Sequence, residues 1–459
     1  MFAAFAAKLN NAYYESAIIL FFKKVLNKIK EIYYASFTAK VIGSVVLWMK
    51  RIVSYSKIWT FVKRRDYLSK IWTNSIIFRF ADAVLNGISK AVRAVYSKIE
   101  NYMESSLFIL VLRAILKKFD VLLGITLGFI LVVPYNFWHN EYGVILVGVL
   151  FIALFLKTVL FKGQQFELKS LDPILVVFII TIILATATSV VPMESLSSLI
   201  LFMTCFLLIL VIVSGIRTTA DLSRLLKIFL TAVTFTGLYG IWQRIIGIPI
   251  DPTTVDTSIN IGMQGRVYST MHDSNTYAEI LLLSLPFYAA VILNSKTFTG
   301  KLCYGLMAVP VLLALIFTGT RSAWIAFAIA VFVFLFFKNR KLIPLIIIAA
   351  VAAFPFLPLI SPSFYNRITT IWNPNDTSIG YRGLIYRTVK PMLEDNWFTG
   401  VGLGSDAFMQ ICSRYPLYTN GVVPPHSHNL FLEIWLEAGI ISILSFVWFM
   451  ARMVKKCMI

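Results

Sequence analysis

The sequence predicts an all-α, polytopic helical membrane protein, and two observations carry that prediction. The first is composition: 58% of the residues are hydrophobic, only 14% are charged, and the mean hydropathy is +0.79. Soluble proteins carry about 25% charged residues, so this chain lacks the charge to cover a water-facing surface. The second is a series of apolar runs, beginning at Asp120, that are long enough to cross a bilayer.

The apolar runs predict about ten transmembrane helices. They lie near residues 120–135, 143–161, 172–191, 197–215, 223–243, 275–294, 302–319, 322–337, 342–360 and 430–450. Basic connections alternate with connections that hold no Lys or Arg, such as 136–142 and 192–196. The basic connections carry Lys162 and Lys169; Arg217, Arg224 and Lys227; Lys296 and Lys301; Lys338, Arg340 and Lys341; and Arg452, Lys455 and Lys456. Because cytoplasmic loops are enriched in Lys and Arg, both termini are predicted to be cytoplasmic.

This topology places three notable connections outside the membrane. They are residues of about 244–275, the tight turn Gly319-Thr320-Arg321, and a long loop of about 361–429 just before the last span. Loops of that length are usually functional or disordered, and this one contains many aromatic and apolar residues. We therefore expect a large folded extracytoplasmic loop. All four histidines (His139, His272, His426 and His428) also fall outside.

Residues 1–118 form a separate region, followed by a membrane domain of residues 119–459. The region holds twenty of the 42 basic residues but six of the 22 acidic ones, and its apolar runs are shorter than a span. We expect basic amphipathic helices on the cytoplasmic membrane surface, binding anionic membrane lipids. The alternative is a pair of poorly hydrophobic spans. No basic patch accompanies a nucleic-acid-binding fold, so no nucleic-acid partner is predicted.

Several arginines lie in the connections that are predicted to be outside, although Lys and Arg are normally enriched in cytoplasmic loops. They are Arg266, Arg321, Arg382 and Arg387. The planar guanidinium binds phosphate oxygens in pairs and stays charged, so arginines that converge at an outer face suit a diphosphate. For any one of them alone, pairing with a loop acid or reaching lipid phosphates is the favoured explanation. Arg321 is the exception, because its place between two spans leaves it little freedom to move away.

His426 and His428 precede the last apolar run. The ordinary pKa of histidine suits a general base near neutrality. The two histidines also resemble half of a metal site, but no Asp, Glu or His partner stands at ligand spacing, so no metal is predicted. A histidine that caps a helix or packs within a loop is the structural alternative.

Five segments, in this order, resemble the O-antigen ligase family, which includes O-antigen and capsule polymerases. They are Gly265–Ala278, Thr318–Trp324, Tyr381–Arg387, Gly400–Gly404 and His426–Gly439. The likeness covers residues of about 120 to 450, and its most specific part is His428 and Asn429 followed, after nine residues, by Gly439.

The resemblance implies a GT-C-like integral membrane glycosyltransferase of the bacterial cytoplasmic membrane. Its donor is a glycan on undecaprenyl diphosphate, its acceptor is a glycan or lipid hydroxyl, and its active site is extracytoplasmic. Arg321 and Arg382 match the arginines that bind the diphosphate, and we add Arg266; His428 matches the histidine that activates the acceptor. The supporting residues are Asn275, Tyr381, Arg387, His426 and Asn429. The implied reaction inverts the anomeric carbon and needs neither metal nor cofactor.

Three alternatives stay open from the sequence. A ligase and a polymerase share this donor and differ in acceptor. A polysaccharide flippase or transporter is a different class, but coupled transporters place ionisable residues deep in their spans. These spans hold few, with Glu279 about one turn from an outer end. A scaffold for an envelope complex, without catalysis, is the third.

Overall fold

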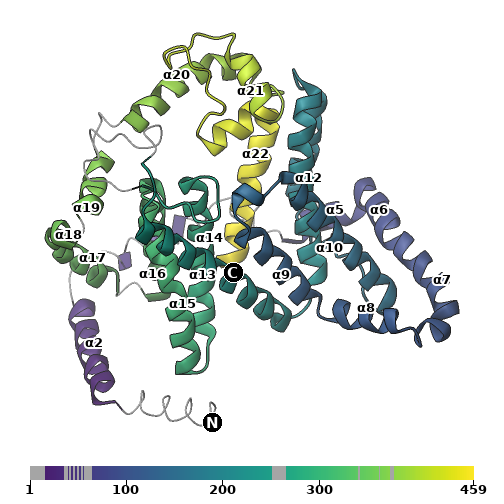
Figure 1. Ribbon diagram of the computed structural model, residues 1–459, viewed down its shortest axis with the longest axis horizontal. Helices are drawn as coiled ribbons and strands as arrows, with labels where there is room; N and C mark the ends of the chain where they lie inside the picture. Colours follow the sequence, from purple (N-terminus) through teal and green to yellow (C-terminus); the bar gives the residue numbers. More distant parts are fainter. Residues whose placement is uncertain are drawn as a thin grey trace. The chain divides into compact units, whose positions relative to one another are not determined.

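The computed structural model (Figure 1) describes residues 16–35, several positions between 40 and 55, 65–250, 265–339, 342–360, 362–372 and 377–458. Every regular element within these ranges is a helix, as the sequence predicts. Parts of the predicted amphipathic region 1–118, and the predicted cytoplasmic cations Arg340 and Lys341, lie outside the described residues.

Eight of the described helices are long and apolar enough to cross a membrane. They are Asn140–Leu160, Pro192–Gly215, Thr219–Ile246, Ser274–Asn294, Phe298–Phe317, Arg321–Asn339, Leu342–Leu359 and Leu430–Lys456. Two shorter apolar helices, Phe119–Val132 and Pro173–Ala187, account for the other two predicted runs. The chain is therefore an all-α integral membrane protein. Its orientation in the membrane stays a prediction.

The first of two compact units comprises residues 1–61, 127–138 and 226–373. Its helices are α2 (Ala17–Ala35), most of α13 (Thr219–Ile246), α14 (Ser274–Asn294), α15 (Phe298–Phe317), α16 (Arg321–Asn339), α17 (Leu342–Ala353), α18 (Leu357–Ile360) and α19 (Pro362–Thr369). Helices α13 to α16 pack around a core to which α14 contributes Tyr277, Leu281 and Tyr288. The Tyr288 hydroxyl donates to the Leu230 carbonyl at 2.6 Å, so the buried phenol keeps a hydrogen-bond partner.

The second unit comprises residues 62–126, 139–225 and 374–459. Its helices are α5 (Arg65–Asn74), α6 (Ile76–Asp82), η1 (Ala83–Gly87), α7 (Ile88–Met103), α8 (Leu107–Lys117), most of α9 (Phe119–Val132), α10 (Asn140–Leu160), α11 (Pro173–Ala187), α12 (Pro192–Gly215), α20 (Thr377–Asn396), α21 (Ser405–Cys412) and α22 (Leu430–Met458). Helix α11 packs along α22, with Leu175, Phe178 and Ile182 facing Ile434 and Ile443.

The long loop before α22 has a core of its own, as predicted. Ile385, Val389 and Met392 of α20 pack with Phe408 of α21 and with Leu436 of α22, and each is no more than 1% exposed. Most of the loop's other aromatic rings stay on the surface; Trp397 is 51% exposed and Phe398 is 55% exposed. The core is therefore mainly aliphatic, and most aromatic rings of the folded loop are exposed on its surface.

Candidate functional site

The turn between α15 and α16 is held by an arginine from the preceding loop. Gly319 has a φ of +64°, a conformation that glycine adopts at little cost. Arg266 Nε donates to the Thr318 carbonyl at 2.9 Å, and Arg266 Nη2 donates to Thr320 Oγ1 at 2.9 Å. One guanidinium thus bonds on both sides of the glycine and fixes the position of the residue that follows the turn, Arg321.

Asn275 orients the same guanidinium. Its Oδ1 accepts from Arg266 Nη2 at 2.7 Å, while its Nδ2 donates to Asp273 Oδ1 at 3.1 Å. Asp273 caps α14 by accepting from the Thr276 backbone N–H at 2.8 Å. Partial burial would raise the pKa of Asp273, but hydrogen bonds from Thr276 and Asn275 and the charge of Arg266 outweigh it, so this pKa is lowered. Asp273 therefore stays a carboxylate, which fixes the Asn275 amide.

Two further arginines meet this turn. Arg321 begins α16, and its Nη1 donates to the Thr370 carbonyl at 2.9 Å and to Thr370 Oγ1 at 3.2 Å. Arg367 of α19 is 7% exposed, and its Nε donates to the Gly319 carbonyl at 3.2 Å. Sequence reasoning missed Arg367, although it is also a basic residue of the long loop that is predicted to lie outside. Three arginines gathered at one turn make a strongly positive site that suits a phosphate-bearing ligand.

His428 lies at the start of α22 in a left-handed conformation, with a φ of +56°. Such a backbone costs a residue other than glycine about 1–2 kcal/mol, so its surroundings must hold it there. Asn429 caps the helix, because its Oδ1 accepts from the backbone N–H of Phe431 at 3.0 Å and of Leu432 at 3.3 Å. On the other side, the Ser427 N–H donates to Glu433 Oε2 at 2.6 Å.

The His428 ring lies among charged and aromatic groups. Its Nδ1 is 3.1 Å from His426 Nε2, within hydrogen-bond distance, and its ring centroid is 6.4 Å from that of Tyr381. Partial desolvation, then the charges of His426 and Arg382, lower the pKa of His428 to about 4. The imidazole is therefore neutral at neutral pH and holds a lone pair that is able to accept a proton.

The glycine-rich segment after α20 packs against α22 through its backbone. The N–H of Val401 donates to the Leu436 carbonyl at 2.7 Å, and that of Gly402 donates to the Glu437 carbonyl at 3.1 Å. At Gly400 a Cβ would lie 2.5 Å from the Glu437 carbonyl oxygen, so only glycine fits this approach. Helix α22 is broken at Gly439, which has a φ of +75°. The bonds satisfy carbonyls just before this break, and they fix the short helical stretch from Leu430 to the break, which His428 precedes.

The predicted site residues thus form one group in each compact unit. Arg266, Asn275 and Arg321 gather at the α15–α16 turn in the first unit. In the second unit, Tyr381, Arg382, His426, His428 and Asn429 gather at the start of α22. Within the described residues the side chains of Arg382 and Arg387, both exposed on α20, make no hydrogen bond. In that same part of the chain, no three His, Cys, Asp or Glu side chains lie close enough to hold a metal ion.

The fold and these groups define a polytopic helical membrane protein whose loops present arginines and a neutral histidine. The model of the O-antigen ligase family matches residues 306–447, which confirms the predicted resemblance to that family over this part of the chain. The matched segment includes Arg321, Arg382 and His428. No curated protein and no solved structure matches the chain. The family supports glycosyl transfer in polysaccharide synthesis as the general function, with a lipid-linked glycan and an acceptor as general partners.

Proposed function

We propose that this protein transfers a glycan from an undecaprenyl-diphosphate-linked donor to an acceptor hydroxyl at the outer face of the bacterial cytoplasmic membrane. It acts as a polysaccharide polymerase or as an O-antigen-type ligase. The observation that carries the proposal is the position of His428, whose Nδ1 lies 3.1 Å from His426 Nε2 and whose ring centroid lies 6.4 Å from that of Tyr381, the chain neighbour of Arg382. The pKa of His428 is lowered to about 4, and Arg382 contributes to that shift. A proton acceptor beside a phosphate-binding group is what this chemistry requires.

The reaction proceeds as a single inverting displacement. The acceptor oxygen attacks the anomeric carbon of the donor glycan, and its proton passes to His428. The bond between that carbon and the diphosphate breaks, and undecaprenyl diphosphate leaves with the electron pair. Arg321 and Arg382 bind the diphosphate and stabilise the charge that grows on it. Arg266 joins them and, through its bonds to Thr318 and Thr320, holds the turn that carries Arg321. No metal ion takes part.

His426 sets the tautomer of His428 in this mechanism. The general base is His428 Nε2, so the proton of the neutral ring must lie on Nδ1 and point to His426 Nε2, 3.1 Å away. His426 is then the acceptor of that bond and a positioning residue. Tyr381 packs beside the His428 ring, Asn429 holds its backbone, Asn275 orients Arg266, and Arg387 adds charge to the donor side.

The test replaces the proposed arginines and the base one at a time. We expect Arg321→Ala, Arg382→Ala and His428→Ala each to abolish transfer while the protein still inserts in the membrane. Arg414→Ala is a matched control, because Arg414 is an exposed arginine that follows α21 and has no role in the proposal. Transfer at the wild-type rate in all three variants would overturn the proposal.

Deletion of the gene separates the two forms of the reaction. Single repeat units that remain attached at the cell surface indicate a polymerase. Full-length polymer that remains unattached indicates a ligase. A flippase or transporter is the alternative from another class. It predicts that the donor glycan stays at the inner leaflet of the deletion strain. A scaffold without catalysis predicts instead that the variants of Arg321, Arg382 and His428 keep full transfer.

A further inference from the structure

A continuous apolar stripe runs along α6, η1 and α7 and is covered by no other described part of the chain. Its members recur at spacings of three or four residues, which places them on one face of the helical run. They are Phe80, Val84, Ile88, Val92, Val95 and Ile99, and each is at least 39% exposed. The neighbouring α8 adds Leu107 and Phe108, which are 76% and 71% exposed. Exposed apolar area of this extent marks a surface that meets an apolar partner.

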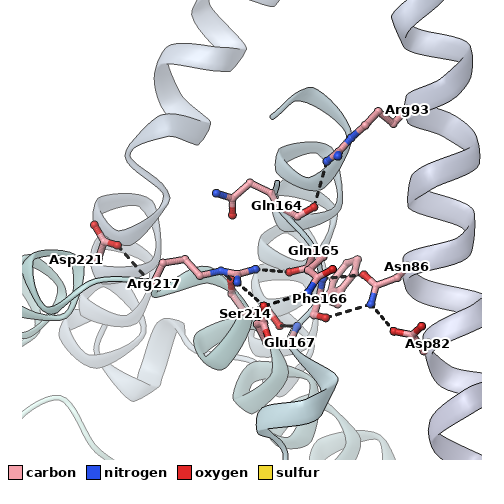
Figure 2. A network of polar contacts seen from close by, with 10 residues as sticks. All are labelled: Asp82, Asn86, Arg93, Gln164, Gln165, Phe166, Glu167, Ser214, Arg217 and Asp221. Carbon is pink, nitrogen blue, oxygen red and sulfur yellow. Dashed lines mark hydrogen bonds and ion pairs between the residues drawn. The ribbon is translucent and has the colours of Figure 1, made fainter. Parts of the chain in front are cut away.

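The opposite side of this helical run forms hydrogen bonds with the loop after α10 (Figure 2). The Asn86 side chain pairs with the Phe166 backbone in both directions, donating to its carbonyl at 3.1 Å and accepting from its N–H at 2.8 Å. Trp72 Nε1 donates to the Leu168 carbonyl at 2.9 Å. Ser89 Oγ lies 2.6 Å from Thr158 Oγ1. These contacts fix the rotation of α7 about its axis, so the apolar stripe is held facing away from α10.

Arg93 completes this attachment at the end of α10. Its Nη2 donates to the carbonyls of Thr158 and Phe161, the second at 2.7 Å. It also donates to the Gln164 carbonyl at 3.1 Å, as Figure 2 shows. A guanidinium is well placed there, because the last carbonyls of a helix have no partner within it. Its Nε is buried and has no hydrogen-bond partner among the described residues.

A cavity of about 230 Å³ opens between α7 and the end of α10. Its polar lining comes from Lys90, Arg93, Tyr96, Ser97, Glu100 and Lys162. The single carboxylate, Glu100, is neutralised by Arg113 at 3.0 Å. Across the described ranges, neither Lys90 nor Lys162 has a carboxylate within 4.0 Å. The cavity therefore carries an excess of positive charge, with hydroxyl donors beside it.

We propose that this cavity binds the phosphate of an acidic phospholipid. Lys90 and Lys162 contact the phosphate oxygens, and Tyr96 and Ser97 supply neutral donors. The adjoining stripe lies in the same leaflet among the acyl chains, which sets the cavity at headgroup depth. Loop charges predict the end of α10 to be cytoplasmic, so the lipid comes from the inner leaflet. The proposal does not rest on the proposed glycan transfer.

The test uses the full-length protein in nanodiscs that contain phosphatidylglycerol and phosphatidylcholine, with native mass spectrometry to count retained lipids. The variant K90E/K162E reverses both cavity lysines. Its matched control is K70E/K98E, because Lys70 and Lys98 are exposed on α5 and α7 but do not line the cavity. We expect wild type and the control to retain phosphatidylglycerol, and K90E/K162E to retain about tenfold less or lower still.

Four further results decide the outcome. The neutral variant K90Q/K162Q should retain an intermediate amount, and all four proteins should melt at similar temperatures. Equal retention by the two charge-reversed variants would overturn the proposal, because the effect would then be general surface charge. Release of the lipid by inorganic phosphate alone would also overturn it, since the cavity would then bind a free anion.

Discussion

Gly439 lies so close to Phe398 that a Cβ on residue 439 would stand 1.9 Å from the Phe398 carbonyl oxygen. Its φ of +75° and ψ of −178° break α22 at that point. The N–H of the next residue, Ile440, donates to the Trp397 carbonyl at 3.0 Å. The break therefore lets the folded loop hydrogen-bond to the middle of α22, and it ends the short helical stretch that His428 precedes.

The change Gly439→Ala should disrupt the packing of residue 439 against the Phe398 carbonyl. Alanine at a positive φ costs about 1–2 kcal/mol, and the contact with the Phe398 carbonyl adds to that cost because backbone must move. We expect a lower melting temperature in detergent and a loss of transfer. The matched control is Gly421→Ala, since Gly421 has a similar φ of +79° but nothing within 4 Å of the added carbon. Equal melting temperatures for the two variants would contradict a role for the close approach.

Much of this fold could be predicted from hydropathy and charge. The ten apolar runs are helices, and the turn before Arg321 and the loop before Leu430 lie where the sequence predicts. Composition suffices for these because a span must bury an uninterrupted apolar length in lipid. The family motifs also identified groups that the structure brings together, such as Arg266 with Asn275.

The contacts that orient the candidate residues could not be predicted in the same way. Arg367 reaches the Gly319 carbonyl from 48 residues away, and no local pattern encodes such a pairing. The left-handed conformation of His428 depends on Ser427, Asn429 and the Glu433 carboxylate acting together. The cavity beside Lys90 requires the side of α7 that faces α10 to be known. Each depends on tertiary packing rather than on periodicity.

A buried carboxylate joins the first residues of α11 to the last turns of α22. Asp172 is 3% exposed at its side chain, and it accepts from Arg452 Nη2 at 2.9 Å and from Lys456 Nζ at 3.0 Å. Burial would raise the pKa of Asp172, but hydrogen bonds from Arg452, Lys456 and the Ile174 N–H outweigh it and lower this pKa. The stabilisation is thus complete at neutral pH and is lost only as the pH falls below the usual range of aspartate.

Asp172→Asn should therefore destabilise the second unit. The asparagine amide still caps α11, but it leaves the two cations beside a buried neutral group. We expect the free energy of unfolding to fall by about 3 kcal/mol, and by somewhat less because Lys456 is partly exposed to solvent. Thermal melting measures the loss. Glu394→Gln is the matched control: the Glu394 carboxylate is 65% exposed and lies 3.9 Å from Lys390 Nζ, so little change is expected. A control that melts as early as Asp172→Asn would contradict this account.

His426 should act on the rate of transfer through the tautomer of His428. His426→Gln keeps an acceptor oxygen near His428 Nδ1, whereas His426→Ala removes it. We expect kcat to fall about tenfold or more in the alanine variant, to recover in part in the glutamine variant, and KM for the donor to stay unchanged. A purely structural role predicts instead that both variants lose stability and that kcat and KM change together.

The pH dependence of transfer should show that His428 acts as a base. Its pKa is lowered to about 4, so the neutral form that accepts the proton predominates above that value and is lost as the pH falls through it. We expect a rate that is level from about pH 5.5 upward and declines near pH 4. His426→Ala removes one of the charges that lower this pKa, so the acid decline should move to higher pH. His428→Ala supplies the background profile. A decline centred at 6.5, the ordinary pKa of histidine, would show that His428 is not held in the environment described, and a profile unchanged in His428→Ala would remove it from the proton transfer.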